Sequence, residues 1–239
     1  GFDRDRLLIV SVDGARSQMP QAQRSALNER VREAAASVPG VAGAVALRSV
    51  PISVDHWLAS VVVPGQTPPP GDTRTFLNSV SPGWFSIFGV PLLAGRDFSP
   101  QDRPATELVA IVNTAFIRRF AGGRSLVGET VRFSDWQDSP PFRVIGLVGD
   151  SGAAIYYGLR EEIPPTVYLH VAQRQMGIRD FTPLVSYRIA VSSAHGSPLA
   201  LVRGIAQAIE RVDPDLKTSF RTMSDYIGAT MMYERLAAV

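Results

Sequence analysis

The sequence contains no cysteine, which excludes a disulfide scaffold, thiolate zinc sites and a cysteine nucleophile. It has no run that approaches the roughly 18 apolar residues of a membrane-spanning helix, and no signal peptide opens it. No block of like charge stands out, whereas nucleic-acid binding depends on a concentrated basic stripe. These absences predict a soluble chain that does not bind nucleic acid.

What is present is typical of a globular protein. Hydrophobic residues make up 45% and charged residues 19% of the 239 residues. The 24 Lys and Arg residues barely exceed the 22 Asp and Glu residues, so the net charge is only +2. This length is enough for one large domain or two small ones, each with its own core.

The first quarter of the chain predicts a strand–helix–strand unit. Leu7–Val12 is a short apolar run rich in β-branched residues, which indicates a buried strand. Apolar residues at helical spacing predict a helix over Gln21–Ser37, which Pro39 and Gly40 end. A second strand is predicted over Val41–Val50.

The last quarter predicts a second unit of the same kind. Val185–Val191 alternates as a strand does, and Ser197 followed by Pro198 is a strong helix start. Lys217–Arg221 predicts another strand. We expect Ser224 to cap a final helix.

Between these units the pattern is different. The middle predicts two short helices, one with Ser81 as its N-cap and Trp84, Phe85 and Phe88 on an aromatic face, the other over Thr114–Phe120. The proline-rich stretch Pro64–Thr73 predicts an exposed, mobile loop. Strands are predicted at Leu58–Val63, Arg74–Val80, Leu108–Val112, Thr130–Phe133, Phe142–Val148 and Val167–His170.

Eight segments, in matching order and spacing, resemble the periplasmic core domain of MacB-type (FtsX-like) ABC transporter permeases. No single segment is specific, but eight in register form a recognisable pattern. They are Val80–Phe85, Gly89–Phe98, Val109–Asn113 with the following Ala115 and Phe116, Leu126–Gly128, Val144–Asp150, Pro164–Leu169, Val212–Leu216 and Tyr233–Leu236.

The resemblance implies an α+β fold. Residues 1–97 and 184–239 would form a porter-like subdomain of two βαβ units, interrupted by an inserted small α/β subdomain at residues 98–183. The sequence is most similar to the duplicated orphan permeases, which carry two such domains and no fused ATPase.

The resemblance also implies a function and a location. The chain would be the extracytoplasmic, non-catalytic domain of a permease, on the periplasmic face of the inner membrane. Membrane helices would flank it, before Gly1 and after Leu236. It would transmit ATP-driven motion of those helices for efflux or export. Its partners would be the flanking helices and a cytoplasmic ATPase subunit, with a second copy of the domain or a periplasmic adaptor as further partners. No cofactor is implied.

An alternative is a serine hydrolase, because Gly149–Gly152 copies the GDSG sequence around the nucleophile of chymotrypsin-like proteases. Ser151 would be the nucleophile, with His56 upstream. The surrounding motifs of that class are absent, so a turn after a buried strand is the simpler interpretation. A second alternative is a free-standing periplasmic binding module, which would have its own export signal and no flanking spans.

No other residues form a recognisable site. His56, His170 and His195 are far apart and have no partner at metal-ligand spacing. Glu161 and Glu162 read as a charged loop, and Gly122–Ser125 lacks the phosphate-binding pattern of a P-loop. We therefore predict no catalytic, cofactor-binding or metal-binding residue, and we expect the aromatic face at Trp84 to be core.

Overall fold

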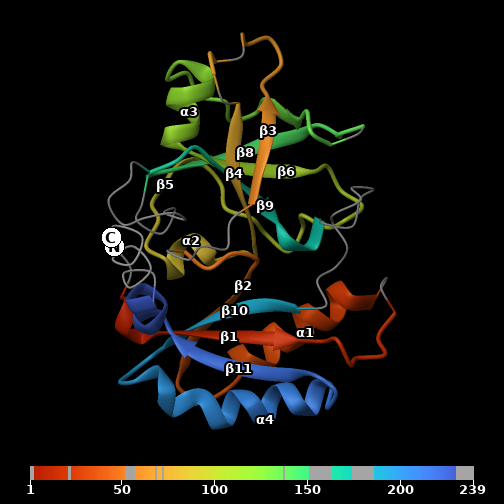
Figure 1. Cartoon of the computed structure of the whole chain (residues 1–239), viewed down its shortest axis with the longest axis vertical. Helices are drawn as coiled ribbons and strands as arrows, with labels where there is room; N and C mark the ends of the chain where they lie inside the picture. The colour runs from red at the N-terminus through yellow and green to blue at the C-terminus, as the bar shows by residue number, and fades with distance from the viewer. Residues whose placement is uncertain are drawn as a thin grey trace, which may run out of the picture. The chain divides into compact units, whose positions relative to one another are not determined.

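The computed structural model describes residues 3–20, 23–51, 57–67, 69–71, 73–136, 138–150, 163–173 and 186–229. The chain divides into two compact units (Figure 1). We call Phe2–Arg48 together with Thr182–Val239 the two-layer unit, and Ser49–Phe181 the barrel unit. The two-layer unit is therefore built from both ends of the chain.

The two-layer unit contains both predicted strand–helix–strand segments. Its elements are β1 (Leu7–Asp13), α1 (Arg24–Ala36), β2 (Val41–Leu47), β10 (Ser186–Ser193), α4 (Val202–Val212) and β11 (Lys217–Thr222). The helix predicted after Ser197 begins there with a short 3-10 turn, in which the Ser197 side chain accepts a hydrogen bond from the Leu199 amide. These local predictions are confirmed.

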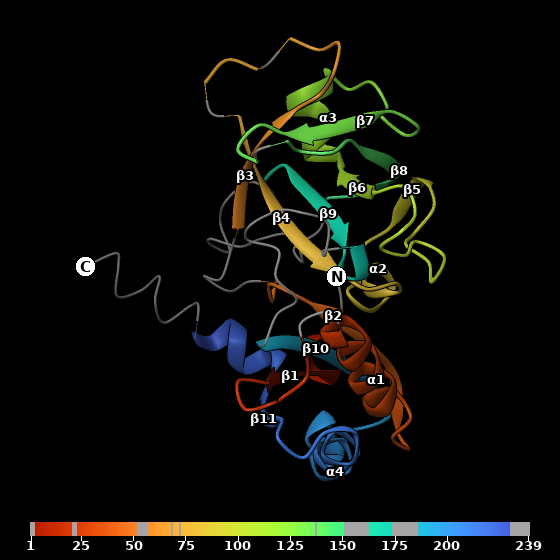
Figure 2. The same ribbon diagram turned by 90° about the vertical axis from the view of Figure 1, so that its right-hand side faces the viewer.

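The strands of this unit form one antiparallel sheet in the order β11-β1-β10-β2. Helices α1 and α4 pack against the same face of the sheet (Figure 2). Alternate residues of β1, beginning with Leu8 and Val10, point into this interface, where they meet Val31 of α1 and Ile205 of α4.

The barrel unit is organised around a ring of strands. They are β3 (Trp57–Val62), β4 (Arg74–Val80), β6 (Val109–Asn113), β7 (Thr130–Phe133), β8 (Phe142–Val148) and β9 (Thr166–His170). The order is β4-β3-β7-β8-β6-β9, and β9 also pairs in parallel with β4, which closes the ring. A short strand, β5 (Leu92–Gly95), pairs with β8 alongside the ring.

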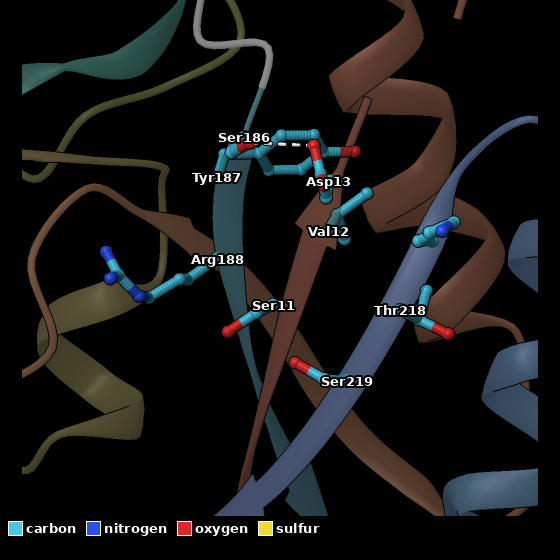
Figure 3. Close-up of a pocket in the computed structure, with 9 residues that line it drawn as sticks. Ser11, Val12, Asp13, Ser186, Tyr187, Arg188, Thr218 and Ser219 are labelled. Atoms are coloured by element: carbon cyan, nitrogen blue, oxygen red, sulfur yellow. Dashed lines mark hydrogen bonds between the residues drawn. The ribbon is translucent and has the colours of Figure 1, made fainter. Parts of the chain in front are cut away.

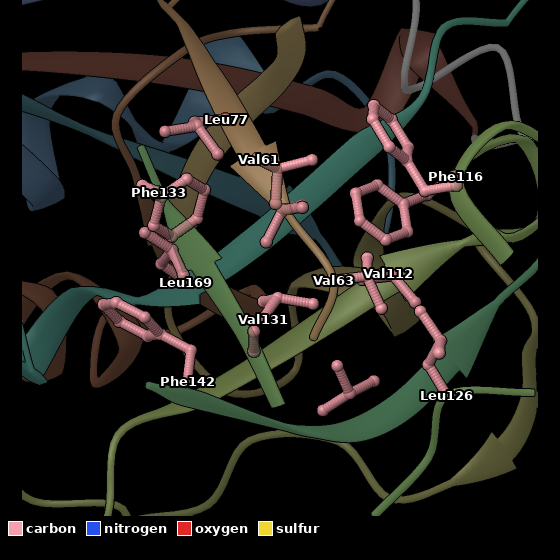
Figure 4. Packing of buried hydrophobic residues seen from close by; sticks show 14 of the residues in the cluster. Val61, Val63, Leu77, Val112, Phe116, Leu126, Val131, Phe133, Phe142 and Leu169 are labelled. Atoms are coloured by element: carbon pink, nitrogen blue, oxygen red, sulfur yellow. The ribbon is translucent and has the colours of Figure 1, made fainter. Parts of the chain in front are cut away.

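Apolar side chains fill the ring (Figure 4). Helix α3 (Thr114–Ala121) adds Phe116 and Phe120, whose stacked rings lie 4.7 Å apart. Burying one such side chain contributes about 1.5–3 kcal/mol. Asn113 fixes the start of α3, because its Oδ1 accepts hydrogen bonds from the amides of Phe116 and Thr166. The barrel core and α3 therefore form one packed body.

The short aromatic helix α2 (Trp84–Ile87) differs in one detail from the prediction. Ser81 was expected to cap it, but the N-cap is Gly83, with a left-handed φ of 83° and no side-chain cap. The Ser81 carbonyl instead accepts a turn hydrogen bond from the Trp84 amide. Trp84 and Phe88 are both 0% exposed, so the prediction that this face is core is confirmed.

The division of the chain differs from the predicted domain boundaries. We expected residues 1–97 with 184–239 in one subdomain and 98–183 in the other, whereas the first boundary lies between Arg48 and Ser49. The reason is the closure of the ring. Strand β4 pairs with β3 on one side and β9 on the other, which draws residues 57–80 into the barrel unit. The inserted part is therefore larger than predicted and contains a six-strand barrel.

The start of the last helix also differs from the prediction. Residues 223–229 are helical, and Thr222, not Ser224, caps them. The Thr222 hydroxyl accepts a hydrogen bond from the Asp225 amide, and the Asp225 carboxylate accepts one from the Thr222 amide. This reciprocal pair is a capping box with Asp in place of the usual Glu.

Candidate functional site

The GDSG sequence has a structural role where the structure describes it. Gly149 donates its amide to the Pro91 carbonyl. The Asp150 carboxylate accepts a 2.9 Å hydrogen bond from the Ala115 amide, in the first turn of α3, and pairs with Arg118 at 2.8 Å. Asp150 therefore anchors a helix, which fits the turn interpretation. Ser151 and Gly152 lie outside the described residues, as does His56.

The remaining histidines do not come together. His170 is buried in the barrel unit, where its Nδ1 accepts a hydrogen bond from the Ala172 amide and its ring meets Phe98 edge-on. His195 lies in the other unit and is exposed. Among the residues that the structure describes, no cluster of His, Cys, Asp or Glu could hold a metal ion.

The other segments considered from sequence also have structural explanations or lie outside the description. Gly122 ends α3 in a left-handed conformation, and Arg124 pairs with Glu129 at this turn. No phosphate cradle is needed to explain these glycines. Glu161 and Glu162 lie outside the described residues.

A hollow of about 470 Å³ lies on the sheet of the two-layer unit. We call it the Lys217 hollow. Strands β1, β10 and β11 supply all of its lining, so it belongs to one unit. The lining residues are Ser11, Val12, Asp13, Ser186, Tyr187, Arg188, Lys217, Thr218 and Ser219.

The register of the sheet arranges the polar lining residues in two rows. Arg188 and Ser219 lie directly opposite Ser11, one on each side. Figure 3 shows these three side chains pointing to the same side of the sheet. Because side chains alternate along a strand, this is the face that points away from α1 and α4.

The second row lies one step further along the same face. Ser186 and Lys217 lie opposite Asp13. The Asp13 carboxylate accepts hydrogen bonds from the Ala15 amide at 2.9 Å and the Ser186 hydroxyl at 3.0 Å. These hydrogen bonds, with the charge of Lys217, hold the pKa of Asp13 below its ordinary value. Asp13 is therefore a satisfied anion at neutral pH.

Tyr187 lines the hollow but does not offer it an acid or a base. Its ring faces the core shared with α1 and α4. Burial, with a smaller effect from the charge of Glu29, raises the pKa of the Tyr187 phenol well above its usual range. The groups of the lining that can bind a ligand are therefore hydroxyls and cations.

Sequence reasoning missed this hollow. Its residues come from three strands, β1, β10 and β11, and the segments that hold β1 and β11 are more than 200 residues apart in the chain. One signal was available, because Lys217 is the single lysine among the 24 basic residues. A lone lysine in an otherwise arginine-only set marks a position to inspect.

The two-layer unit also brings the two ends of the described chain together. Leu8, near the start of β1, lies opposite Thr222, the last residue of β11. Beyond the strands, the Ser224 hydroxyl donates a 2.9 Å hydrogen bond to the Asp5 carboxylate. The chain therefore enters and leaves the sheet at the same end, on neighbouring strands.

Within the described ranges, no helix combines the length and apolar character that crossing a bilayer requires. Residues 1–211 match the family model described as the MacB-like periplasmic core domain. No curated protein sequence matches the chain.

Solved structures of similar fold come from several bacteria. The periplasmic region of MacB from Actinobacillus actinomycetemcomitans has a TM-score of 0.59 at 14% identity, with 95% of this chain and 92% of that chain covered. The extracellular domain of the noncanonic ABC-type transporter YknZ from Gram-positive bacteria has a TM-score of 0.57 at 15% identity, with 90% of this chain and 98% of that chain covered. A domain of a putative permease protein from Porphyromonas gingivalis has a TM-score of 0.53 at 17% identity, covering 93% of each chain.

Proposed function

Because this chain belongs to the MacB-like periplasmic core domain family, and is the extracytoplasmic domain of an ABC transporter permease, we propose that it is a mechanical element that carries motion from the membrane helices to a substrate or partner. Such a permease has membrane helices and works with an ATPase. ATP binding and hydrolysis in the cytoplasm would move those helices, and this domain would follow them as a rigid body.

One observation carries this proposal. The antiparallel pairing of β1 with β11 places the entry and exit of the described chain side by side, from Leu8 opposite Thr222 to Asp13 opposite Lys217. A displacement applied at both ends then enters one sheet through two adjacent strands. The hydrogen bonds between those strands resist separation of the ends, so motion passes into the whole two-layer unit.

The domain would perform this role without chemistry of its own. The Asp150 carboxylate of the GDSG sequence, for example, is held in structural contacts with α3. The two-layer unit would be the porter-like part, and the parent protein would be a duplicated orphan permease served by a separate ATPase subunit. The parent gene tests the last point, since it should encode a second such domain and no fused ATPase. A free-standing gene with its own export signal would instead indicate a binding module.

A cross-link provides the direct functional test. These 239 residues contain no cysteine, so in a permease whose remaining cysteines are replaced by serine, Asp5→Cys with Ser224→Cys introduces one defined pair. In the intact permease, with its ATPase, oxidation of this pair should leave transport unchanged, because the two positions move together. Abolished transport, restored by reduction, would refute rigid-body transmission.

Two controls accompany this experiment. Each single cysteine variant should be insensitive to oxidation, which separates the cross-link from oxidative damage. Ser151→Ala should leave transport intact, and a serine-directed fluorophosphonate should not label the purified chain. Labelling that disappears in Ser151→Ala would support the hydrolase alternative.

A further inference from the structure

We propose that the Lys217 hollow binds a phosphate group, either free or as part of a phosphate ester. This inference concerns the two-layer unit alone and stands independently of the mechanical role. It starts from the cross-strand row in which Ser11 lies between Arg188 and Ser219.

The spacing of the sheet puts several donors within reach of one ligand. Directly opposite residues in an antiparallel pair have Cβ atoms about 4.5–5.5 Å apart. The Ser11 and Ser219 hydroxyls therefore lie at adjacent positions on one face, and Lys217 is two residues from Ser219 on the same strand and the same face. Residues two apart on a strand are roughly 7 Å apart, a distance that a lysine side chain spans.

The charges on this face favour an anion. Lys217 and Arg188 are the cations of the lining, and Asp13 is its single acid. Asp13 is held by the Ala15 amide and the Ser186 hydroxyl. The exposed face of β11 adds Arg221, which lies over the Tyr226 ring, and carries no acid. Arg188 contributes its charge while its Nη1 donates to the Arg48 carbonyl.

The number of donor groups favours phosphate over carboxylate. Two hydroxyls, an ammonium and a guanidinium line the hollow, and they come from three strands. A phosphate ester presents three acceptor oxygens in a tetrahedral arrangement, whereas a carboxylate presents two in a plane. The hollow is also larger than a phosphate ion, which leaves room for the body of an ester.

The single lysine allows the site to be observed directly. Reductive methylation of the full 239-residue chain with ¹³C-formaldehyde labels Lys217 and the terminal amine, and the signal that Lys217→Gln lacks belongs to Lys217. The Lys217 methyl signal is followed by NMR during titration with inorganic phosphate, glycerol 3-phosphate and dihexanoyl phosphatidic acid below its micelle concentration. Acetate at equal ionic strength is the comparison.

We expect a saturable shift with the phosphate compounds and at least tenfold weaker binding of acetate. Ser11→Ala and Ser219→Ala should each weaken phosphate binding about tenfold. Both changes are small and affect no packed core side chain. Tighter binding of the short-chain lipid than of glycerol 3-phosphate would identify a lipid headgroup as the source, and equal binding would identify a free phosphate ester.

A matched pair of variants separates the site from general attraction of anions. Lys217→Gln and Arg203→Gln each remove one positive charge, the second from the exposed surface of α4. In amide-detected titrations of the unmodified chain, Lys217→Gln should weaken phosphate binding at least tenfold, and Arg203→Gln should not change it. Equal effects of the two variants, equal binding of acetate, or insensitivity to both serine variants would overturn the proposal.

Discussion

The Ser224 hydroxyl donates a hydrogen bond to the Asp5 carboxylate across a sequence separation of 219 residues. Both groups are exposed, so this bond adds little stability by itself. The two ends lie close together because β1 pairs with β11, and this hydrogen bond forms where they meet. The sheet therefore holds the ends together, and the hydrogen bond marks where they meet.

The capping box at the end of β11 gives a first prediction. Thr222→Ala removes the hydroxyl that accepts from the Asp225 amide, which leaves a helix N-terminus without its side-chain cap. We expect the free energy of unfolding to fall by about 1 kcal/mol. Urea denaturation measures this loss, and hydrogen exchange should show faster opening of residues 223–229.

Ser224→Ala is the matched control for that variant. It removes only the exposed contact with Asp5, so the change should stay within about 0.5 kcal/mol. If Ser224→Ala destabilised the protein more than Thr222→Ala, the assignment of the cap to Thr222 would be wrong.

The buried carboxylate of Asp102 gives a second prediction. The Asp102 side chain is 6% exposed, and Arg96 donates two hydrogen bonds of 2.8 Å to it. The Ser99 amide donates a third. The Asn side chain in Asp102→Asn is neutral and cannot accept these three hydrogen bonds as a carboxylate does. The substitution should therefore lower the free energy of unfolding at pH 7 by about 2–3 kcal/mol.

The same carboxylate predicts a pH dependence. Burial raises the pKa of Asp102, but the hydrogen bonds from Arg96 and Ser99 outweigh it and hold the pKa below its ordinary value of 3.8. A lowered folded-state pKa stabilises the protein above the unfolded-state pKa, and this stability is lost as pH falls through the folded-state pKa. The difference in free energy of unfolding between wild type and Asp102→Asn should therefore have its full size at pH 6 and shrink below about pH 4. A difference that grew on acidification would contradict the assignment.

Gly95 gives a third prediction. It has a φ of 75°, and a Cβ there would collide with the Ile145 carbonyl oxygen and come within 2.9 Å of the Gly146 Cα. Both obstacles are backbone atoms of β8, so the strands would have to separate. Gly95→Ala should destabilise the protein by more than about 2 kcal/mol, measured by denaturant titration.

Gly128→Ala separates the collision from the backbone strain. Gly128 also has a positive φ, 91°, but nothing lies within 4 Å of its added Cβ. Its substitution should cost only the left-handed strain of about 1–2 kcal/mol. Equal effects at the two glycines would show that β5 does not press against β8 as described.

Local patterns predicted the elements far better than their assembly. Strands such as β4, β7 and β8 have the bounds expected from sequence, because each is a short apolar or alternating run between turn residues. The exception is β5, whose four residues are all exposed and therefore carry no burial pattern.

Closure of the barrel could not be predicted in this way. It depends on the parallel pairing of β4 with β9, from Phe76 opposite Thr166 to Val80 opposite His170. No local signal reports a partner that far away in the chain, so residues 57–80 were assigned to the wrong side of the domain boundary. The Lys217 hollow was missed for the same reason, since only the register brings Ser11, Arg188 and Ser219 together.

The distance between residues 5 and 224 in the working transporter tests the central claim most directly. Spin labels on Asp5→Cys and Ser224→Cys, in the intact permease with its ATPase, allow this short distance to be measured by dipolar broadening of the continuous-wave EPR spectrum, without nucleotide and with nucleotide trapped. Rigid-body transmission predicts the same narrow distance distribution in both states, while transport continues in the labelled protein. A separation of the two labels on nucleotide trapping would show that the ends move apart, and would contradict the account.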